Sequence, residues 1–179
     1  MEFSELIRTR RSCRSYSSEP VSREEIEALL DENVLAPSAC NSQPWHFTVL
    51  LSEEVRAAGA EAVAVFPPSN LFAKEAAALI VFSAEKEPAV SQRVLTKYPA
   101  DRFAEIDIGI AAAHFTLAAA ERGLGTCILG AFDAEKLTKL AHLPEAVQPK
   151  LVITLGHPAE TSTAPVKKRK PAAEKTTVL

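Results

Sequence analysis

The chain has 179 residues, of which 47% are hydrophobic and 24% are charged, a balance that is typical of one compact globular domain and excludes a chain disordered throughout. Its formal net charge of −3 gives no reason to expect nucleic acid as the main partner. The 3 cysteines form no C-x-x-C pair and the 4 histidines lack metal-ligand spacing, so neither a disulfide framework nor a zinc site is expected.

Apolar residues at helical spacing predict a series of helices. A short helix over residues 3–10 comes first, and a polar, irregular stretch follows it. Ser22 and Glu25 form the S-x-x-E capping box of the next helix, which Pro37 should stop. The remaining helical segments are residues 52–65, a brief turn at 72–76, a long helix at 103–122 and a helix that Asp133 caps and that runs to residue 141. Gly123 stands where a helix C-cap glycine belongs.

The helix at 103–122 is apolar on nearly all sides, so we expect it to be central and buried. Its most apolar part, residues 106–120, is shorter than a membrane span and carries Asp107 and His114. The start of the chain lacks the apolar core of a signal peptide. A cytoplasmic protein with no membrane partner is therefore expected.

Strands are predicted at residues 45–51, 79–83, 126–129 and 151–155. Residues 36–44 form a loop with two prolines, and the polar residues 85–103 are predicted to form a mobile lid. The tail from His157 onward either wraps a partner or is disordered, and its composition favours disorder. We expect a single domain over residues 1–179, with residues 157–179 as a C-terminal extension.

Strands separated by helices indicate a layered arrangement of helices and sheet. A doubly wound nucleotide-binding fold is a poor match, because no G-x-G-x-x-G follows the first strand and no G-x-x-x-x-G-K-[ST] occurs.

Basic side chains crowd both ends of a chain that is mildly acidic between them. They are Arg8, Arg10, Arg11 and Arg14 at the start and Lys167, Lys168, Arg169 and Lys170 at the end. Arginine binds phosphate oxygens in bidentate fashion, and the Ser12 hydroxyl could complete such a site if folding brings the two ends together. Charge alone favours the alternative, in which both ends are merely solvated.

The loop at residues 36–44 places three neutral hydrogen-bonding residues, Ser38, Asn41 and Gln43, just before a strand. Such groups suit the polar edge of a flat heterocycle. The alternative is a connection stabilised by Asx or Ser turns, which composition alone favours.

Taken together, these segments resemble the FMN-dependent nitroreductase family. R-R-S-x-R near the start is followed by A-P-S-x-x-N-x-Q-P-W. Residues 104–109 resemble the start of the family's central helix, residues 123–130 its next turn and strand, and residues 155–158 with 167–169 its closing strand and basic tail. The resemblance covers nearly the whole chain in the family's order.

The resemblance implies an α+β fold, a nitroreductase-like three-layer α-β-α sandwich with a mixed, mainly antiparallel central sheet and an intertwined dimer. The family builds its flavin sites across a two-fold interface, so a homodimer with two equivalent FMN sites is implied. The apolar helix at 103–122 also needs more cover than one subunit of this length is expected to provide.

The resemblance also implies cofactor-binding residues. Those for the FMN phosphate and ribityl chain are Arg10, Ser12 and Arg14, with Arg11 close by, and Lys167 and Arg169 from the tail. Those for the flavin ring are Pro37 and Ser38, serving the partner subunit's flavin, with Asn41 supporting their loop; Asn70 at the pyrimidine edge; and the Leu129 and Gly130 backbone near N5.

The implied function is that of an NAD(P)H oxidoreductase. NADH or NADPH would deliver hydride to flavin N5, and a nitroaromatic, quinone or similar small electrophile would accept it in a ping-pong scheme. No side-chain base is required, so we assign no catalytic role to His114, Cys13 or Cys40. Tyr98 and Phe103 could stack on a substrate, although packing is favoured for both. Two alternatives remain: a flavin carrier without turnover, and an interaction domain whose basic ends bind acidic partners.

Overall fold

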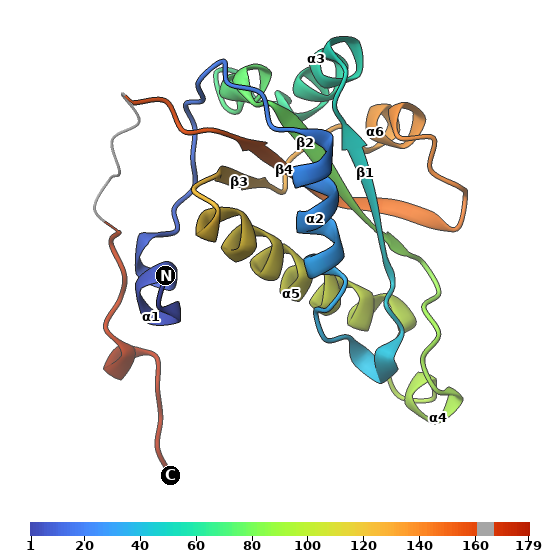
Figure 1. Cartoon of the computed structure of the whole chain (residues 1–179). Helices are drawn as coiled ribbons and strands as arrows, with labels where there is room; N and C mark the ends of the chain where they lie inside the picture. The colour runs from blue at the N-terminus through green and yellow to red at the C-terminus, as the bar shows by residue number, and fades with distance from the viewer. Residues whose placement is uncertain (161–166) are drawn as a thin grey trace.

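The structure, a computed structural model, describes residues 1–160 and 167–179 (Figure 1). Its centre is an antiparallel sheet in the order β1-β2-β4-β3. The strands are β1 (Trp45–Leu50), β2 (Ala78–Glu85), β3 (Gly125–Leu129) and β4 (Val147–Gly156). All four predicted strands are present, but β2 and β4 are longer than predicted, because the pairs Ala84–Gln148 and Glu85–Val147 extend both strands beyond their apolar runs. A register shift between Phe82 and Ser83 accommodates Pro149 within β4.

The helices agree closely with the sequence pattern. They are α1 (Phe3–Thr9), α2 (Arg23–Asn33), α3 (Glu53–Val63), α4 (Gln92–Leu95), α5 (Ala100–Glu121) and α6 (Ala134–Leu140), with short 3₁₀ turns η1 (Ala39–Asn41), η2 (Leu71–Glu75) and η3 (Ala172–Glu174). Ser22 Oγ accepts a hydrogen bond from Glu25 N at 3.1 Å, as the capping box predicts. Gly123 has φ +77°, and Leu124 N donates to Ala119 O, which is the Schellman end of α5.

Helices cover both faces of the sheet. Ile80 and Phe82 of β2 pack in one buried cluster with residues of α2 and α5, whereas Leu79 and Val81 pack in a second cluster with residues of α3 and α6. This alternation of side chains along β2 gives the sheet two buried faces. Figure 1 shows α2 and α5 lying over one side of the strands.

The long helix α5 is buried on one side only. Ala104, Ile108 and Phe115 are buried, whereas Ile106 is 51% exposed and Ile110 is 37% exposed. The sequence analysis expected this helix to need more cover than one subunit provides, and within one chain this side of α5 is open. The window Asp101–Glu121 is long and apolar enough to cross a membrane by length and hydropathy, but a core helix passes the same test and 44% of the window is buried within the fold.

The segment predicted to be a lid contains α4 and the first residues of α5. The Tyr98 and Phe103 rings meet edge to face with their centroids 6.0 Å apart, and the Arg102 guanidinium lies 5.3 Å from the Tyr98 ring centroid. These aromatic residues therefore pack against each other.

Candidate functional site

The basic segment after α1 runs along the end of β3 and is held there by its backbone. Ser12 forms a parallel bridge with Thr126, and Cys13 N donates to Thr126 O at 2.8 Å. The buried Tyr16 hydroxyl donates to Cys13 O at 3.0 Å and lies 2.6 Å from Thr154 Oγ1 on β4. Backbone bonds thus fix the path of the arginine-rich segment on the sheet.

Gly125 allows this close approach. A Cβ atom at position 125 would lie 2.8 Å from both Cys13 Cβ and Cys13 Sγ, and 3.1 Å from Pro158 Cγ. A larger residue would therefore push the basic segment away from β3.

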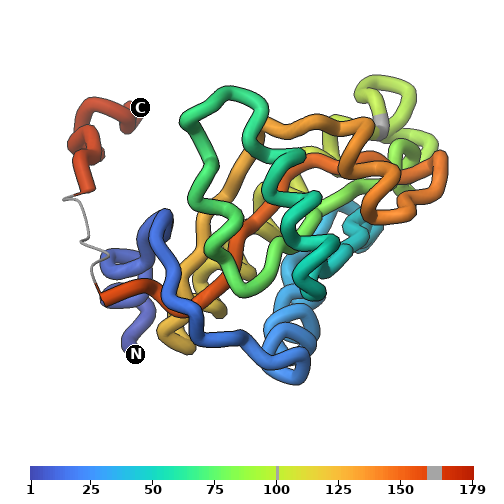
Figure 2. Tube along the Cα trace, turned by 90° about the horizontal axis from the view of Figure 1, so that it is seen from above, coloured from blue at the N-terminus to red at the C-terminus, as the bar shows by residue number. Residues whose placement is uncertain are grey.

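The two basic ends of the chain meet at α1. Lys167 Nζ donates to Ile7 O at 3.0 Å and to Arg8 O at 2.6 Å, where the last carbonyls of α1 lack helical partners. Desolvation lowers the pKa of Lys167, and the positive charges of Arg10 and Arg169 lower it further. Figures 1 and 2 both show α1 and the segment from Lys167 onward on the same side of the molecule.

This basic cluster, defined as Arg10, Arg14, Lys167 and Arg169, carries positive charge without a balancing carboxylate. Within residues 1–160 and 167–179, none of the four forms an ion pair. A small cavity of about 180 Å³ opens beside Arg10, between Cys13 and Gly123. The arrangement is suited to an anion such as a phosphate group.

Cys127 on β3 lies beneath the same segment. Burial raises the pKa of its thiol, whereas the charges of Arg14 and Arg10 and a hydrogen bond with Ser12 act in the opposite direction. These interactions place Arg10, Ser12 and Arg14 around one point of β3. The sequence analysis did not place Cys127 near the basic segment, because only the register of Ser12 against Thr126 brings Cys127 and that segment together.

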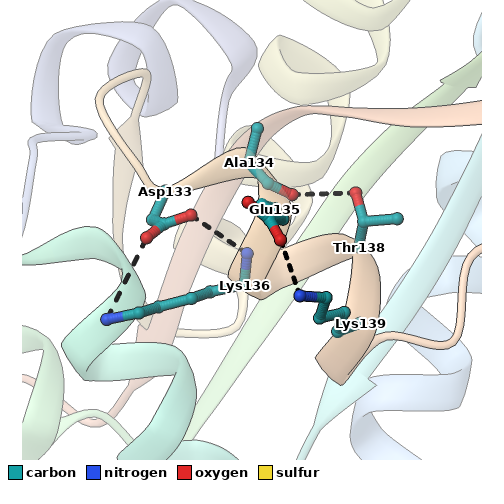
Figure 3. A network of polar contacts seen from close by, with 6 residues as sticks. All are labelled: Asp133, Ala134, Glu135, Lys136, Thr138 and Lys139. Atoms are coloured by element: carbon teal, nitrogen blue, oxygen red, sulfur yellow. Dashed lines mark hydrogen bonds and ion pairs between the residues drawn. The ribbon is translucent and has the colours of Figure 1, made fainter.

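Asn70 and the segment after β3 are anchored to neighbouring carbonyls at the end of α3. Asn70, with φ +64°, donates from Nδ2 to Val63 O at 2.9 Å. Asp133 N donates to Ala62 O at 2.8 Å, and the Asp133 carboxylate accepts from Lys136 N at 3.0 Å to cap α6 (Figure 3). Asn70 and Asp133, which follows the exposed Gly130 by three residues, are therefore anchored at the same end of α3.

The loop at residues 36–44 has an unusual backbone. Cys40, Asn41 and Gln43 all have left-handed conformations, with φ values of 53°, 53° and 46°. Ser38 Oγ accepts from Gln43 N at 3.0 Å, and Ser38 O accepts from Asn41 N at 3.1 Å. Pro37 is exposed just before this turn, so the predicted ring-contacting residues lie on an ordered, outward-facing loop.

A buried carboxylate attaches this loop to α5. Both Asp107 Oδ atoms lie 3.1 Å from Ala39 N, and Asp107 is 2% exposed. The sequence analysis assigned Asp107 no role of its own. An acidic residue inside an apolar helix was the signal that could have found it.

Within one chain the two parts of the site do not meet. The loop at 36–44 is attached to α5 at Asp107, whereas Arg10 of the basic cluster lines a cavity with Gly123, just beyond the other end of the helix. The rise of an α-helix places Asp107 and Glu121, the last residue of α5, about 21 Å apart. Figure 1 shows the loop and α1 at opposite ends of α5.

The chain is similar to proteins of one family. Residues 7–157 match the model of the nitroreductase family. A protein of Archaeoglobus fulgidus, provisionally named an NADH dehydrogenase/NAD(P)H nitroreductase, is 35% identical over 163 residues, which cover 89% of this chain and 87% of that protein. A Bacillus subtilis protein named FMN reductase (NAD(P)H) is 28% identical over 163 residues, covering 85% of this chain and 64% of that protein.

Solved structures agree in fold. A nitroreductase family protein of Streptococcus pneumoniae has a TM-score of 0.84 at 22% identity and covers 99% of this chain and 100% of its own. A provisionally named nitroreductase of Exiguobacterium sibiricum, in complex with FMN, has a TM-score of 0.86 at 21% identity, covering 100% and 98%. The α+β fold expected from the sequence is confirmed.

Proposed function

Because this chain belongs to the nitroreductase family, we propose that it is an FMN-dependent NAD(P)H oxidoreductase. An oxidoreductase is what the family and the names of the relatives support. The observation that carries the choice of FMN is the basic cluster, in which cations from both ends of the chain meet at the end of α1 and form no ion pair with a carboxylate among the described residues.

The basic cluster fits a phosphate group. Arg10, Arg14, Lys167 and Arg169 would hold the phosphate, with Ser12 supplying a hydroxyl and Arg11 lying in the same segment. Lys167 has its pKa lowered partly by its positive neighbours, so a bound anion would relieve repulsion that already exists in the fold. Charge-assisted hydrogen bonds of this kind are the strong ones in proteins.

The Asn70 side chain and the Gly130 backbone would contact the flavin ring. The Nδ2 atom of Asn70 is already bonded to Val63 O, so its Oδ1 remains as an acceptor for the N3–H donor of a flavin pyrimidine. The exposed backbone of Gly130, next to Leu129 at the end of β3, would lie near N5. Pro37 and Ser38 of the partner subunit would cover the ring, with Asn41 shaping their loop.

When bound, FMN would supply the redox chemistry between NADH or NADPH and a small acceptor such as a nitroaromatic or a quinone. The residues of the chain would bind and orient the cofactor. Cys127 would not act as a nucleophile, because burial raises its pKa and keeps the thiol protonated.

The division of the site supports a homodimer. The loop at 36–44 and the basic cluster lie at opposite ends of α5, so one chain alone does not surround a flavin. The exposed side of α5, with Ile106 and Ile110, offers an apolar surface for a second copy. A two-fold pairing would let the loop of each subunit serve the cofactor of the other.

The first experiment is an absorbance spectrum of the purified protein, supplemented with FMN if needed, before and after anaerobic addition of NADH or NADPH. We expect a bound-flavin spectrum that bleaches on reduction. Bound flavin that neither nucleotide reduces would favour a flavin carrier instead. A protein that binds no FMN would contradict the proposal altogether.

A further inference from the structure

Asp107 is a buried acid whose carboxylate has one hydrogen-bond partner, Ala39 N, among the described residues. Its carboxylate is 2% exposed, and both oxygens share the N–H of Ala39 at 3.1 Å. Within the described part of the chain it forms no ion pair. Burial raises the pKa of Asp107, and the hydrogen bond from Ala39 opposes that shift. Burying a carboxylate without a compensating cation costs folding free energy. A structural role for Asp107 would account for that cost.

The loop that Asp107 holds needs support from outside. Cys40 and Asn41, at the centre of the turn, both have φ +53°, a conformation that non-glycine residues keep only when their surroundings enforce it. The hydrogen bonds of Ser38 with Asn41 N and Gln43 N lie within the loop itself. The bond from Ala39 N to Asp107 spans 68 residues and attaches the loop to α5.

We infer that Asp107 is a positioning residue that holds the Ser38–Asn41 turn at the height and angle at which it meets the flavin ring. This inference rests on the proposed FMN function and adds to it a residue that touches neither cofactor nor substrate. Asp107 acts through Ala39 N–H, and a rigid central helix carries the attachment point. The position of the turn is thereby fixed relative to α5, the same helix that offers the apolar surface for the second subunit.

A double-mutant cycle on the full-length protein tests the attachment. Asp107→Asn keeps the shape of the side chain and one acceptor but removes the charge. Ala39→Pro removes the donor, and the backbone permits it, because Ser38 has the extended φ −140° and ψ 156° that a residue before proline adopts and Ala39 opens η1. Glu105→Gln, at an exposed position two residues earlier on α5, is the matched control for the lost charge.

We expect Asp107→Asn to speed hydrogen exchange in the 36–45 peptide on the order of tenfold and to lower the melting temperature, as loss of a charge-assisted bond requires. In the Ala39→Pro background the same change should not lower the melting temperature further, because it then removes a buried charge that has no donor. Equal losses in both backgrounds would overturn the inference, since Asp107 would then act through other contacts. Glu105→Gln should leave the loop peptide unchanged.

A flavin readout separates positioning from stability. In Asp107→Asn loaded with FMN, we expect the visible flavin spectrum and the midpoint potential to shift, and Glu105→Gln should match the parent protein. A faster-exchanging loop with an unchanged spectrum and potential would contradict the positioning role. If the parent protein binds no FMN, the proposed function fails and the role toward flavin fails with it, whereas the melting and exchange cycle still decides the Asp107–Ala39 attachment.

Discussion

Single residues of the basic cluster carry the proposal for FMN. Arg14 is exposed, lies near Cys127 and Ser12, and forms no ion pair within the described residues. The change Arg14→Ala should weaken FMN binding by about 1.5 kcal/mol, roughly tenfold in Kd, the lower end for a bond to a charged group because the site is open to solvent. Titration of the apoprotein with FMN at low and high salt measures it, and the effect should shrink as salt rises.

The control for that change is Arg23→Ala. Arg23 forms an exposed i,i+4 ion pair with Glu27 on α2, and such pairs contribute little to stability. FMN affinity should be the same in this variant as in the parent protein. An Arg14→Ala protein that also keeps the parent affinity would remove Arg14 from the phosphate site.

The buried Tyr16 hydroxyl should make the free energy of unfolding fall at alkaline pH. Burial raises the pKa of its hydroxyl far above the ordinary value, and the hydrogen bond with Thr154 only partly opposes this. The stabilising contribution is complete below about pH 10 and is lost at higher pH, because the unfolded chain then releases the proton and the folded chain does not. Urea unfolding between about pH 9 and 11 should show a steeper fall in the free energy of unfolding for the parent protein than for Tyr16→Phe.

The matched control is Tyr98→Phe, since Tyr98 is 46% exposed. It should leave the alkaline slope unchanged. At neutral pH, Tyr16→Phe should cost about 1–3 kcal/mol, because Cys13 O loses its donor and Thr154 loses a partner. If the free energy of unfolding fell equally steeply with pH in Tyr16→Phe and in the parent protein, Tyr16 would not be the source of the alkaline loss of stability.

At the scale of elements, the seam between the basic segment and β3 depends on Gly125. Gly125→Ala would bring a Cβ to 2.8 Å from Cys13 Cβ, so backbone has to move. We expect a loss of about 1–3 kcal/mol in the free energy of unfolding, together with weaker FMN binding as the arginines are displaced. Denaturant titration and FMN titration measure the two effects. A Gly125→Ala protein with the stability and FMN affinity of the parent protein would contradict this account of the seam.

The elements also show where local sequence information was sufficient. The helices α2, α5 and α6 have their own start or stop residues in Ser22, Gly123 and Asp133, and each behaves in the structure as predicted. The lengths of β2 and β4 were underestimated, because cross-strand pairing between them continues beyond their apolar runs. Composition predicted that α5 needs cover on nearly all sides, but it does not reveal which side one chain leaves exposed.

At the scale of the whole molecule, the central prediction is the dimer. Ile110→Glu places a charge in the middle of the exposed apolar side of α5, so dimerisation should fail and FMN affinity should fall with it. Sedimentation velocity with and without FMN measures dimerisation, and FMN titration measures the affinity. Ala57→Glu, at an exposed position on α3 in the opposite layer, adds the same charge and should leave the dimer intact. A parent protein that is monomeric and saturated with FMN would contradict the divided site.

The sequence by itself determined the local features: capped helices, apolar strands, and the motifs at Arg10–Arg14 and at residues 36–45 through which the family resemblance was recognised. Each depends on residues close together in the chain. The tertiary structure decided that Lys167 meets Arg10 and that Asp107 holds Ala39. It also decided that the basic cluster and the loop at 36–44 lie at opposite ends of α5. These relations depend on strand register and on the path of the chain between distant residues, which no local pattern encodes.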